Sequence, residues 1–307
     1  MDFPISQIHA SPVFLIGAGF LIGLLGGFFG VGGSFIAGPA LRLLGMPWNF
    51  AVGTDLAHIV GKSIVAARKH RALGNIDFKL GGIMAAGTIV GAEAGAQAIQ
   101  ALKRHGDVNF VVSIVSITVY VSISSFMCWD AVQTLRKLKS KKTAASGDSS
   151  PKADQTAVAH MTARIQRFHL APMVSLPTSG IERISVWIIL GVAVIGGIFS
   201  GFLGGGAGYI RMPSMVYVLG IPTHLAVGTD LFEIIISAGY ATFSHALKGN
   251  VDILVALVMH TGAAVGAQIG AILTQYIRGP KIRLAFVPLP LIGAAIVIYT
   301  LVTGQKL

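Results

Sequence analysis

Residues 11–41 form the uncharged run that decides the fold, SPVFLIGAGFLIGLLGGFFGVGGSFIAGPAL. A helix of about 20 mostly apolar residues is needed to cross the hydrocarbon core of a bilayer. The run is long enough, but the cluster Gly26-Gly27-Phe28-Phe29-Gly30-Val31-Gly32-Gly33 interrupts it. We therefore predict a membrane helix near 12–28, followed by a piece near 34–44 that is too short to cross.

The whole chain is too apolar for a water-soluble domain. Of its 307 residues, 53% are hydrophobic and 11% are charged, and its mean hydropathy is +0.75. A soluble domain carries roughly 25% charged residues, so lipid must surround most of this chain. We predict an all-α polytopic membrane protein with about 8–10 membrane segments. Besides the interrupted run, the apolar stretches are 49–67, 80–102, 108–129, 184–203, 253–277 and 284–303.

The net charge of +11 points to membrane orientation rather than to nucleic acid. The Lys and Arg residues lie mostly in short loops beside apolar stretches, where the positive-inside rule makes them cytoplasmic. We expect the lipid bilayer and a small anionic solute as partners, with a homodimer as a further possibility and no nucleic acid. The lone cysteine, Cys128, can form no internal disulfide.

The two halves of the chain share motifs at a constant offset of 175 residues. The pairs are Leu44-Gly45-Met46-Pro47 with Leu219-Gly220-Ile221-Pro222, Ala51-Val52-Gly53-Thr54-Asp55-Leu56 with Ala226-Val227-Gly228-Thr229-Asp230-Leu231, and Gly74-Asn75-Ile76-Asp77 with Gly249-Asn250-Val251-Asp252. Many secondary transporters are built from such duplicated units.

The duplication predicts three regions: a first transmembrane repeat over 1–138, a cytoplasmic basic linker over 139–183, and a second repeat over 184–307. Within the linker, 158–168 is either a basic amphipathic helix on the membrane surface or a partly ordered segment. With five crossings per repeat, the basic loop at 278–283 falls on the cytoplasmic side with the linker. Four crossings per repeat would place that loop on the other side. We therefore favour five, and an odd number of crossings gives inverted repeats, with opposite orientations in the membrane.

These motifs carry a family resemblance. A glycine cluster, a Leu-Gly-x-Pro turn, an Ala-Val-Gly-Thr box and a Gly-Asn-hydrophobic-Asp loop all occur twice, and together they resemble the TauE/SafE sulfite exporter family of membrane permeases. The resemblance covers 12–135 and 184–303. It implies a multi-pass protein of the prokaryotic plasma (inner) membrane that transports sulfite, a sulfonate, or a related sulfur oxyanion or organic acid. The Asp after each Gly-Thr departs from the family pattern.

Three ionisable residues of the first repeat lie on one helical face. Asp55, His58 and Lys62 are spaced i, i+3 and i+7. Ionisable groups at membrane depth are costly and usually face the bundle interior with a partner. One hypothesis is a solute site or proton relay lined by Lys62 and His58, with Asp55 as counter-charge. In the structural alternative, Lys62 reaches the interface and Asp55 caps a helix.

The second repeat has Asp230, Glu233 and Ser237 at the corresponding positions. One repeat is therefore cationic where the other is anionic. If both faces meet at a central cavity, Lys62 is predicted to pair with Glu233 or Asp230. A protonatable Glu233 would then couple transport to protons.

Further candidate solute ligands lie at and after the glycine breaks. Helix N-termini with exposed backbone N–H groups favour anions, and interrupted helices at equivalent places in two repeats mark transporter sites. The structural alternative is a tight turn with close packing. Arg211 suits an oxyanion, and Thr54 and Thr229 are either solute ligands or helix starts. The candidate glycines are Gly30, Gly32, Gly33, Gly205, Gly206 and Gly208.

The sequence shows no nucleophile–base pair, no metal-ligand spacing and no ATP-binding motif. We therefore expect neither an enzyme nor a metal site nor a cofactor. The predicted function is secondary transport of a small anion driven by an ion gradient. The alternatives are a passive anion channel and a membrane assembly factor without transport.

Overall fold

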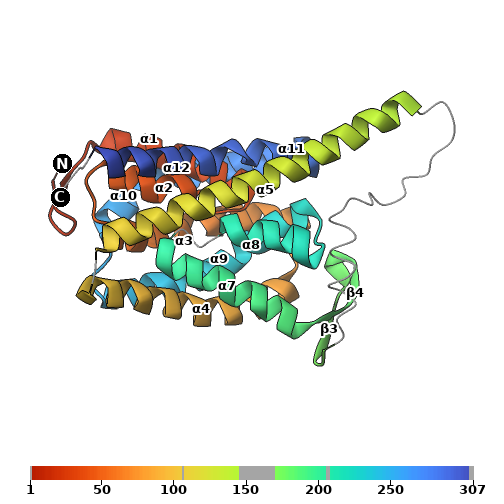
Figure 1. The fold of residues 1–307 in the computed structure, drawn as a ribbon, viewed down its shortest axis with the longest axis horizontal. Coiled ribbons are helices and arrows are strands. Elements are labelled where there is room, and N and C mark those ends of the chain that lie inside the picture. Colours follow the sequence, from red (N-terminus) through yellow and green to blue (C-terminus); the bar gives the residue numbers. More distant parts are fainter. Residues whose placement is uncertain (1, 106, 145–169, 205–207, 304–307) are drawn as a thin grey trace.

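The structure is a computed structural model that describes residues 2–105, 107–144, 170–204 and 208–303. It consists almost entirely of helices (Figure 1). Those of the first half are α1 (Pro12–Phe29), α2 (Ser34–Leu43), α3 (Trp48–Ala72), α4 (Phe78–His105) and α5 (Val108–Ala144).

The second half of the chain is likewise helical, with more interruptions. Its elements are α7 (Val186–Leu203), α8 (Gly208–Ser214), the π-helical η3 (Met215–Leu219), α9 (Thr223–Leu247), α10 (Ile253–Leu273), the 3-10 turn η4 (Thr274–Tyr276), α11 (Gly279–Phe286) and α12 (Pro288–Val302).

The centre of the bundle is formed by α3 and α9, two helices of 25 residues each that pack against one another. On one side of them α1 packs along α10, and on the other side α4 packs along α7 (Figure 1). Each outer pair therefore joins a helix of the first half to one of the second. The halves are interleaved and share a single core.

Glycines let the outer helix pairs approach closely. Along α10, Gly262, Gly266 and Gly270 face backbone atoms of α1, and a Cβ at any of them would collide with a carbonyl oxygen. On α4, Gly91 and Gly95 face α7 in the same way. Small residues are how membrane helices generally achieve close packing, and these glycines play that role in both outer pairs.

Corresponding helices run in opposite directions. In Figure 1, α1 and α3 run away from the end of the bundle that carries both termini, whereas α7 and α9 run toward it. The Ser6 hydroxyl donates to Oδ2 of Asp252 at 2.6 Å, which ties the N-terminal segment to the turn after α9. At the opposite end, α5 extends beyond the other helices.

Seven segments among the described residues are long and apolar enough to cross a membrane. They are Pro12–Phe29, Trp48–Ala72, Val108–Asp130, Val186–Leu203, Thr223–Leu247, Ile253–Tyr276 and Gly279–Val302. The 28-residue α4, which packs along α7, adds a further helix of that length. The predicted multi-pass helical membrane fold is confirmed.

Both glycine breaks separate a long helix from a short one, as predicted. After α1, Gly30, Gly32 and Gly33 have φ values of 75°, 69° and 73°, in the left-handed region that favours glycine. The 10-residue α2 follows. In the second half Gly204, whose φ is 83°, follows the last residue of α7, and α8 begins at Gly208.

The predicted linker differs from expectation at both of its ends. At its start, α5 continues to Ala144. At its end, β3 (Met173–Leu176) and β4 (Ile181–Ser185) form an antiparallel hairpin around the 3-10 turn η1 (Pro177–Ser179). A second short pair, β1 (Asp2–Phe3) with β2 (Ile8–His9), precedes α1. These strands are too short to give a periodic sequence signal, and the proposed amphipathic stretch 158–168 lies outside the described residues.

Candidate solute site

The two glycine breaks meet inside the bundle. A Cβ added to Gly208 would lie 2.6 Å from Cα of Val31 and 2.6 Å from Oδ2 of Asp230. A Cβ added to Gly30 would lie 2.6 Å from Cα of Val227. Each break therefore contacts the other half of the chain, and positions 30 and 208 have no room for a larger residue.

Two of the other candidate glycines, Gly205 and Gly206, lie outside the described residues. Gly33 caps α2, and its carbonyl accepts from the N–H groups of Ile36 and Ala37 at 3.2 and 3.3 Å. The first break thus ends in a regular helix N-terminus, with its positive end inside the protein.

The first charged cluster, Asp55–His58–Lys62 on α3, is fully buried. Each of the three residues is 1% exposed, so Lys62 does not reach an interface. Nδ1 of His58 lies 3.7 Å from Oδ1 of Asp55 and 3.5 Å from Nζ of Lys62. An ammonium has three N–H donors, and His58 is its hydrogen-bond partner within the described chain. Lys62 therefore keeps donors for a solute.

The second charged cluster, Arg211–Asp230–Glu233–Ser237, joins α8 to α9. All four residues are 0% exposed. Nε of Arg211 donates to Oδ1 of Asp230 at 2.9 Å, and its Nη2 lies 2.7 Å from Oε2 of Glu233. Ser237 donates to the same Glu233 oxygen at 3.1 Å. Two carboxylates thus hold this guanidinium, and it is not free to bind an oxyanion.

The predicted pairing of Lys62 with Glu233 or Asp230 is therefore wrong. Arg211 takes both carboxylates because the second break turns α8 back along α9. Gly196 on α7 leaves room for the Arg211 side chain, since a Cβ there would collide with it. Residue 36, at the equivalent position of the first half, is Ile, so the repeat gave no sign of this pairing.

Tyr209 lies between the two clusters and was not singled out from the sequence. It immediately follows Gly208, is 0% exposed, and its hydroxyl has no hydrogen-bond partner among the described residues. It interacts electrostatically with both Asp55 and Arg211. Its ring meets that of Tyr120 edge-on at 5.5 Å. The one available sequence signal was its place directly after the break.

Thr54 and Thr229 hold loops of the opposite half. The hydroxyl of Thr54 accepts from the backbone N–H of Asp252 at 2.9 Å, and that of Thr229 accepts from the N–H of Asp77 at 2.9 Å. The side chains of Asp77 and Asp252 cap the helices that follow them. This favours the structural interpretation of both threonines.

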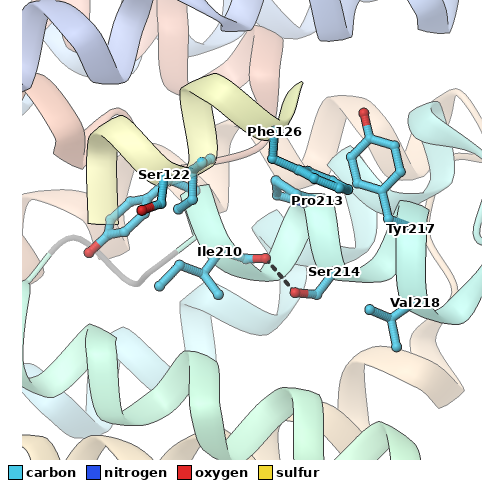
Figure 2. A pocket seen from close by; sticks show the side chains of 9 residues that line it. Ser122, Phe126, Ile210, Pro213, Ser214, Tyr217 and Val218 are labelled. Atoms are coloured by element: carbon cyan, nitrogen blue, oxygen red, sulfur yellow. Dashed lines mark hydrogen bonds between the residues drawn. The ribbon is translucent and has the colours of Figure 1, made fainter. Parts of the chain in front are cut away.

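A separate cavity of about 260 Å³ lies between α5 and the α8–η3 segment (Figure 2). Its wall is mostly apolar and includes no charged residue; the lining residues are Ser122, Ile123, Phe126, Tyr209, Ile210, Pro213, Ser214, Tyr217 and Val218. An anion needs compensating donors or charge at membrane depth, so this cavity does not suit one. Tyr209 is common to the cavity and to the space between the clusters.

In the described part of the chain, no three His, Cys, Asp or Glu side chains gather closely enough to hold a metal ion. What the bundle offers instead is a set of buried ionisable groups beside two interrupted helices. This combination is typical of membrane transporters.

Comparison with known proteins gives the family. The sequence profile of the Sulfite exporter TauE/SafE family matches residues 15–297, and the chain belongs to that family. Probable membrane transporter protein YjnA of Bacillus subtilis is 26% identical over 304 residues, covering 96% of this chain and 99% of the relative. Probable membrane transporter protein YunE of the same organism is 23% identical over 294 residues, covering 93% and 97%. No solved structure matches.

These names point to transport rather than to catalysis. Together with the spanning helices they make the chain a multi-pass plasma-membrane transporter. The resemblance read from the glycine clusters and repeated motifs is thereby confirmed.

Proposed function

We propose that the protein is a secondary active transporter of a small anion, a sulfur oxyanion or related organic acid, and that Lys62 supplies its positive charge. The observation that carries the proposal is the difference between the cations of the two charged clusters. Arg211 is compensated by two carboxylates at 2.7 and 2.9 Å, whereas Lys62 makes its one hydrogen bond among the described residues to His58 and keeps further N–H donors. An anion at membrane depth requires such a donor.

The arrangement of the halves supports alternating access. Corresponding helices run in opposite directions (Figure 1), as inverted repeats would. Reciprocal contacts relate the halves: Gly53 faces the carbonyl of Asn250, and Gly228 faces that of Asn75. The charged clusters are sealed from both ends, so a solute reaches them only if one set of helices moves against the other, as in transporters built from inverted repeats.

The test begins with a thermal-shift screen of the purified protein against sulfite, thiosulfate, sulfate, ethanesulfonate and acetate. We expect at least one anion to stabilise the wild type and to accumulate in proteoliposomes against its own gradient. Accumulation excludes a passive channel. If no anion binds or moves, the proposal fails and an assembly factor without transport is favoured.

The substitution Lys62→Met tests the assigned residue. We expect it to abolish the anion-induced shift, because the positive partner is lost. The matched control is Lys248→Met, which removes a lysine already bound to Glu93 at 3.2 Å; anion binding should persist. Equal binding by Lys62→Met and the wild type would contradict the assignment.

A further inference from the structure

The second charged cluster carries one negative charge too many. Arg211 contributes one positive charge, while Asp230 and Glu233 contribute two negative charges if both are ionised. Oδ2 of Asp230 and Oε1 of Glu233 are buried without a hydrogen-bond partner among the described residues. An uncompensated buried carboxylate is strongly unfavourable, so the cluster favours binding one more positive charge.

The excess charge lies next to the candidate solute site. Asp230 Oδ2 is the atom that a Cβ on Gly208 would meet at 2.6 Å, and the same Cβ would meet Val31 of the first break. A carboxylate pair at this junction repels an anion, and the repulsion is strong because burial limits screening. Neutralising the pair would therefore favour entry of the anion.

The groups facing the pair come from three helices. From α8, Arg211 bonds both acids; from α4, Thr88 interacts with Glu233; and from α9 itself, Ser237 bonds Glu233. Tyr209 also interacts electrostatically with Arg211. The nearby α7 has no titratable residue between Val186 and Leu203.

On α3, which packs along α9, the ionisable groups are Asp55, His58 and Lys62. They contact one another rather than the acids of α9. His260 of α10 faces Gly61 and interacts with His58 and Lys62. Of the cations in the described ranges, Arg211 alone therefore serves the pair on α9 as a direct counter-charge.

We propose that the coupling ion is a proton, held by the Asp230–Glu233 pair and taken up when the anion binds. The inference rests on the proposed anion transport and names its driving ion. One proton on either carboxylate leaves the other to balance Arg211. By linkage, a proton that favours the anion is itself bound more tightly when the anion is present. Anion affinity is then highest at low pH and falls as pH rises, by at most about tenfold per pH unit for one proton.

A metal cation fits the pair less well than a proton. The guanidinium already lies at 2.7 and 2.9 Å from one oxygen of each acid. A sodium or calcium ion requires several oxygen ligands arranged around it and would stand beside this positive charge. A proton needs one carboxylate oxygen only.

Proton uptake by the wild type tests the inference without any substitution. Purified protein in weakly buffered detergent solution between pH 6.5 and 8.5 is mixed with whichever of sulfate, thiosulfate or ethanesulfonate gave the largest thermal shift. Sulfite is left out because it takes up protons itself in this range. We expect the solution to become more alkaline by up to one proton per bound anion. Binding without any proton uptake would overturn the inference.

Two neutral variants locate the proton. Glu233→Gln and Asp230→Asn each leave one acid to balance Arg211. We therefore expect the anion affinity of each variant to be independent of pH. Each variant should still exchange anion across the membrane, but a pH gradient should no longer drive its accumulation. The control is Asp130→Asn, a buried acid that accepts from Tyr217 at 2.8 Å and lies 3.4 Å from Arg283. Its pH dependence should match the wild type.

The outcomes separate this inference from the proposed function. If the wild type transports no anion, the function itself is wrong. If it transports an anion but accumulation follows a sodium gradient, or if both neutral variants keep the wild-type pH dependence, the function stands and the proton assignment fails. If one variant does not fold, the other and the wild-type proton measurement still decide.

Discussion

The two central helices, α3 and α9, have the same length and the same opening motif but different interiors. Both have 25 residues and contain Ala-Val-Gly-Thr-Asp-Leu near their start. One and two turns after the shared Asp, α3 carries His58 and Lys62 where α9 carries Glu233 and Ser237. The two helices share their length and opening motif and differ in the charged side chains that they place inside the bundle.

Two histidines that remain identical make the same contact in both halves. His70 bonds the carbonyl of Gly27 and His245 bonds that of Gly201, both at 3.1 Å, at the last turns before the two breaks. Each contact holds the central helix of one half against the helix that precedes the break in that same half. Positions 58 and 62 are buried and differ between the halves: the second half has Glu233 and Ser237 where the first has His58 and Lys62.

The largest effect is expected from Arg211→Met, which leaves two buried carboxylates without their cation. Removing one partner of a buried ion pair costs about 3–5 kcal/mol. We expect a large fall in the melting temperature of the detergent-solubilised protein. The melting temperature of Lys62→Met should fall much less, because no carboxylate in the described part of the chain lies within hydrogen-bonding distance of Lys62.

The triple substitution Arg211→Met, Asp230→Asn, Glu233→Gln sharpens this contrast. It removes the cation together with both charges that need it, so most of the lost stability should return. If Arg211→Met alone melts like the wild type, the second cluster is not held together by ionised groups, and the contrast between the clusters is lost.

A smaller effect is expected where the breaks meet. Gly208→Ala places a methyl group 2.6 Å from Val31 and from Asp230, and overpacking of this kind costs about 1–3 kcal/mol. Transport should fall severely because the breaks are forced apart. Gly239→Ala on α9 is the matched control, since nothing lies within 4 Å of its added Cβ. Normal transport by Gly208→Ala would show that contact between the breaks is not needed.

Much of the frame could be predicted from the sequence, because each part leaves a local signal. Apolar length indicates the membrane helices, and left-handed glycines mark the break after α1. The constant offset made Thr54 and Thr229 equivalent before their reciprocal bonds were known. The helix caps at Asp77 and Asp252 follow from their position before an apolar run.

The pairing inside the core could not be predicted, because it depends on distances between distant segments. Lys62 and Arg211 are both cations in apolar stretches of sequence. No feature of the neighbouring sequence indicates that Asp230 and Glu233 contact Arg211 and not Lys62. Tyr209 carries no charge and was overlooked for that reason. The hairpin at residues 173–185 was not predicted, because strands of four and five residues are too short to show a clear alternation of apolar and polar residues.

A modest and equal effect is expected from Thr54→Val and Thr229→Val. Each loses one buried hydrogen bond of 2.9 Å to a backbone N–H of the other half, which costs about 1 kcal/mol. Equal losses in melting temperature would show that the frame is symmetric in energy as well as in geometry. Thr261→Val, whose hydroxyl bonds a carbonyl of its own helix, should change stability by less than about 0.5 kcal/mol. A large difference in melting temperature between Thr54→Val and Thr229→Val would show that the two reciprocal hydrogen bonds are not equivalent.

The smallest effect is expected at the apolar cavity between α5 and α8. The Ser214 hydroxyl donates to the carbonyl of Ile210 at 2.8 Å within its own helical segment (Figure 2). Ser214→Ala should therefore change stability by no more than about 0.5 kcal/mol and leave the anion-induced thermal shift unchanged. Tyr209→Phe should also leave stability nearly unchanged, because its hydroxyl has no hydrogen-bond partner in the described structure. If that hydroxyl touches the anion, its removal weakens binding severalfold where Ser214→Ala does not. Weaker anion binding by Ser214→Ala would place the solute in the cavity and not between the charged clusters.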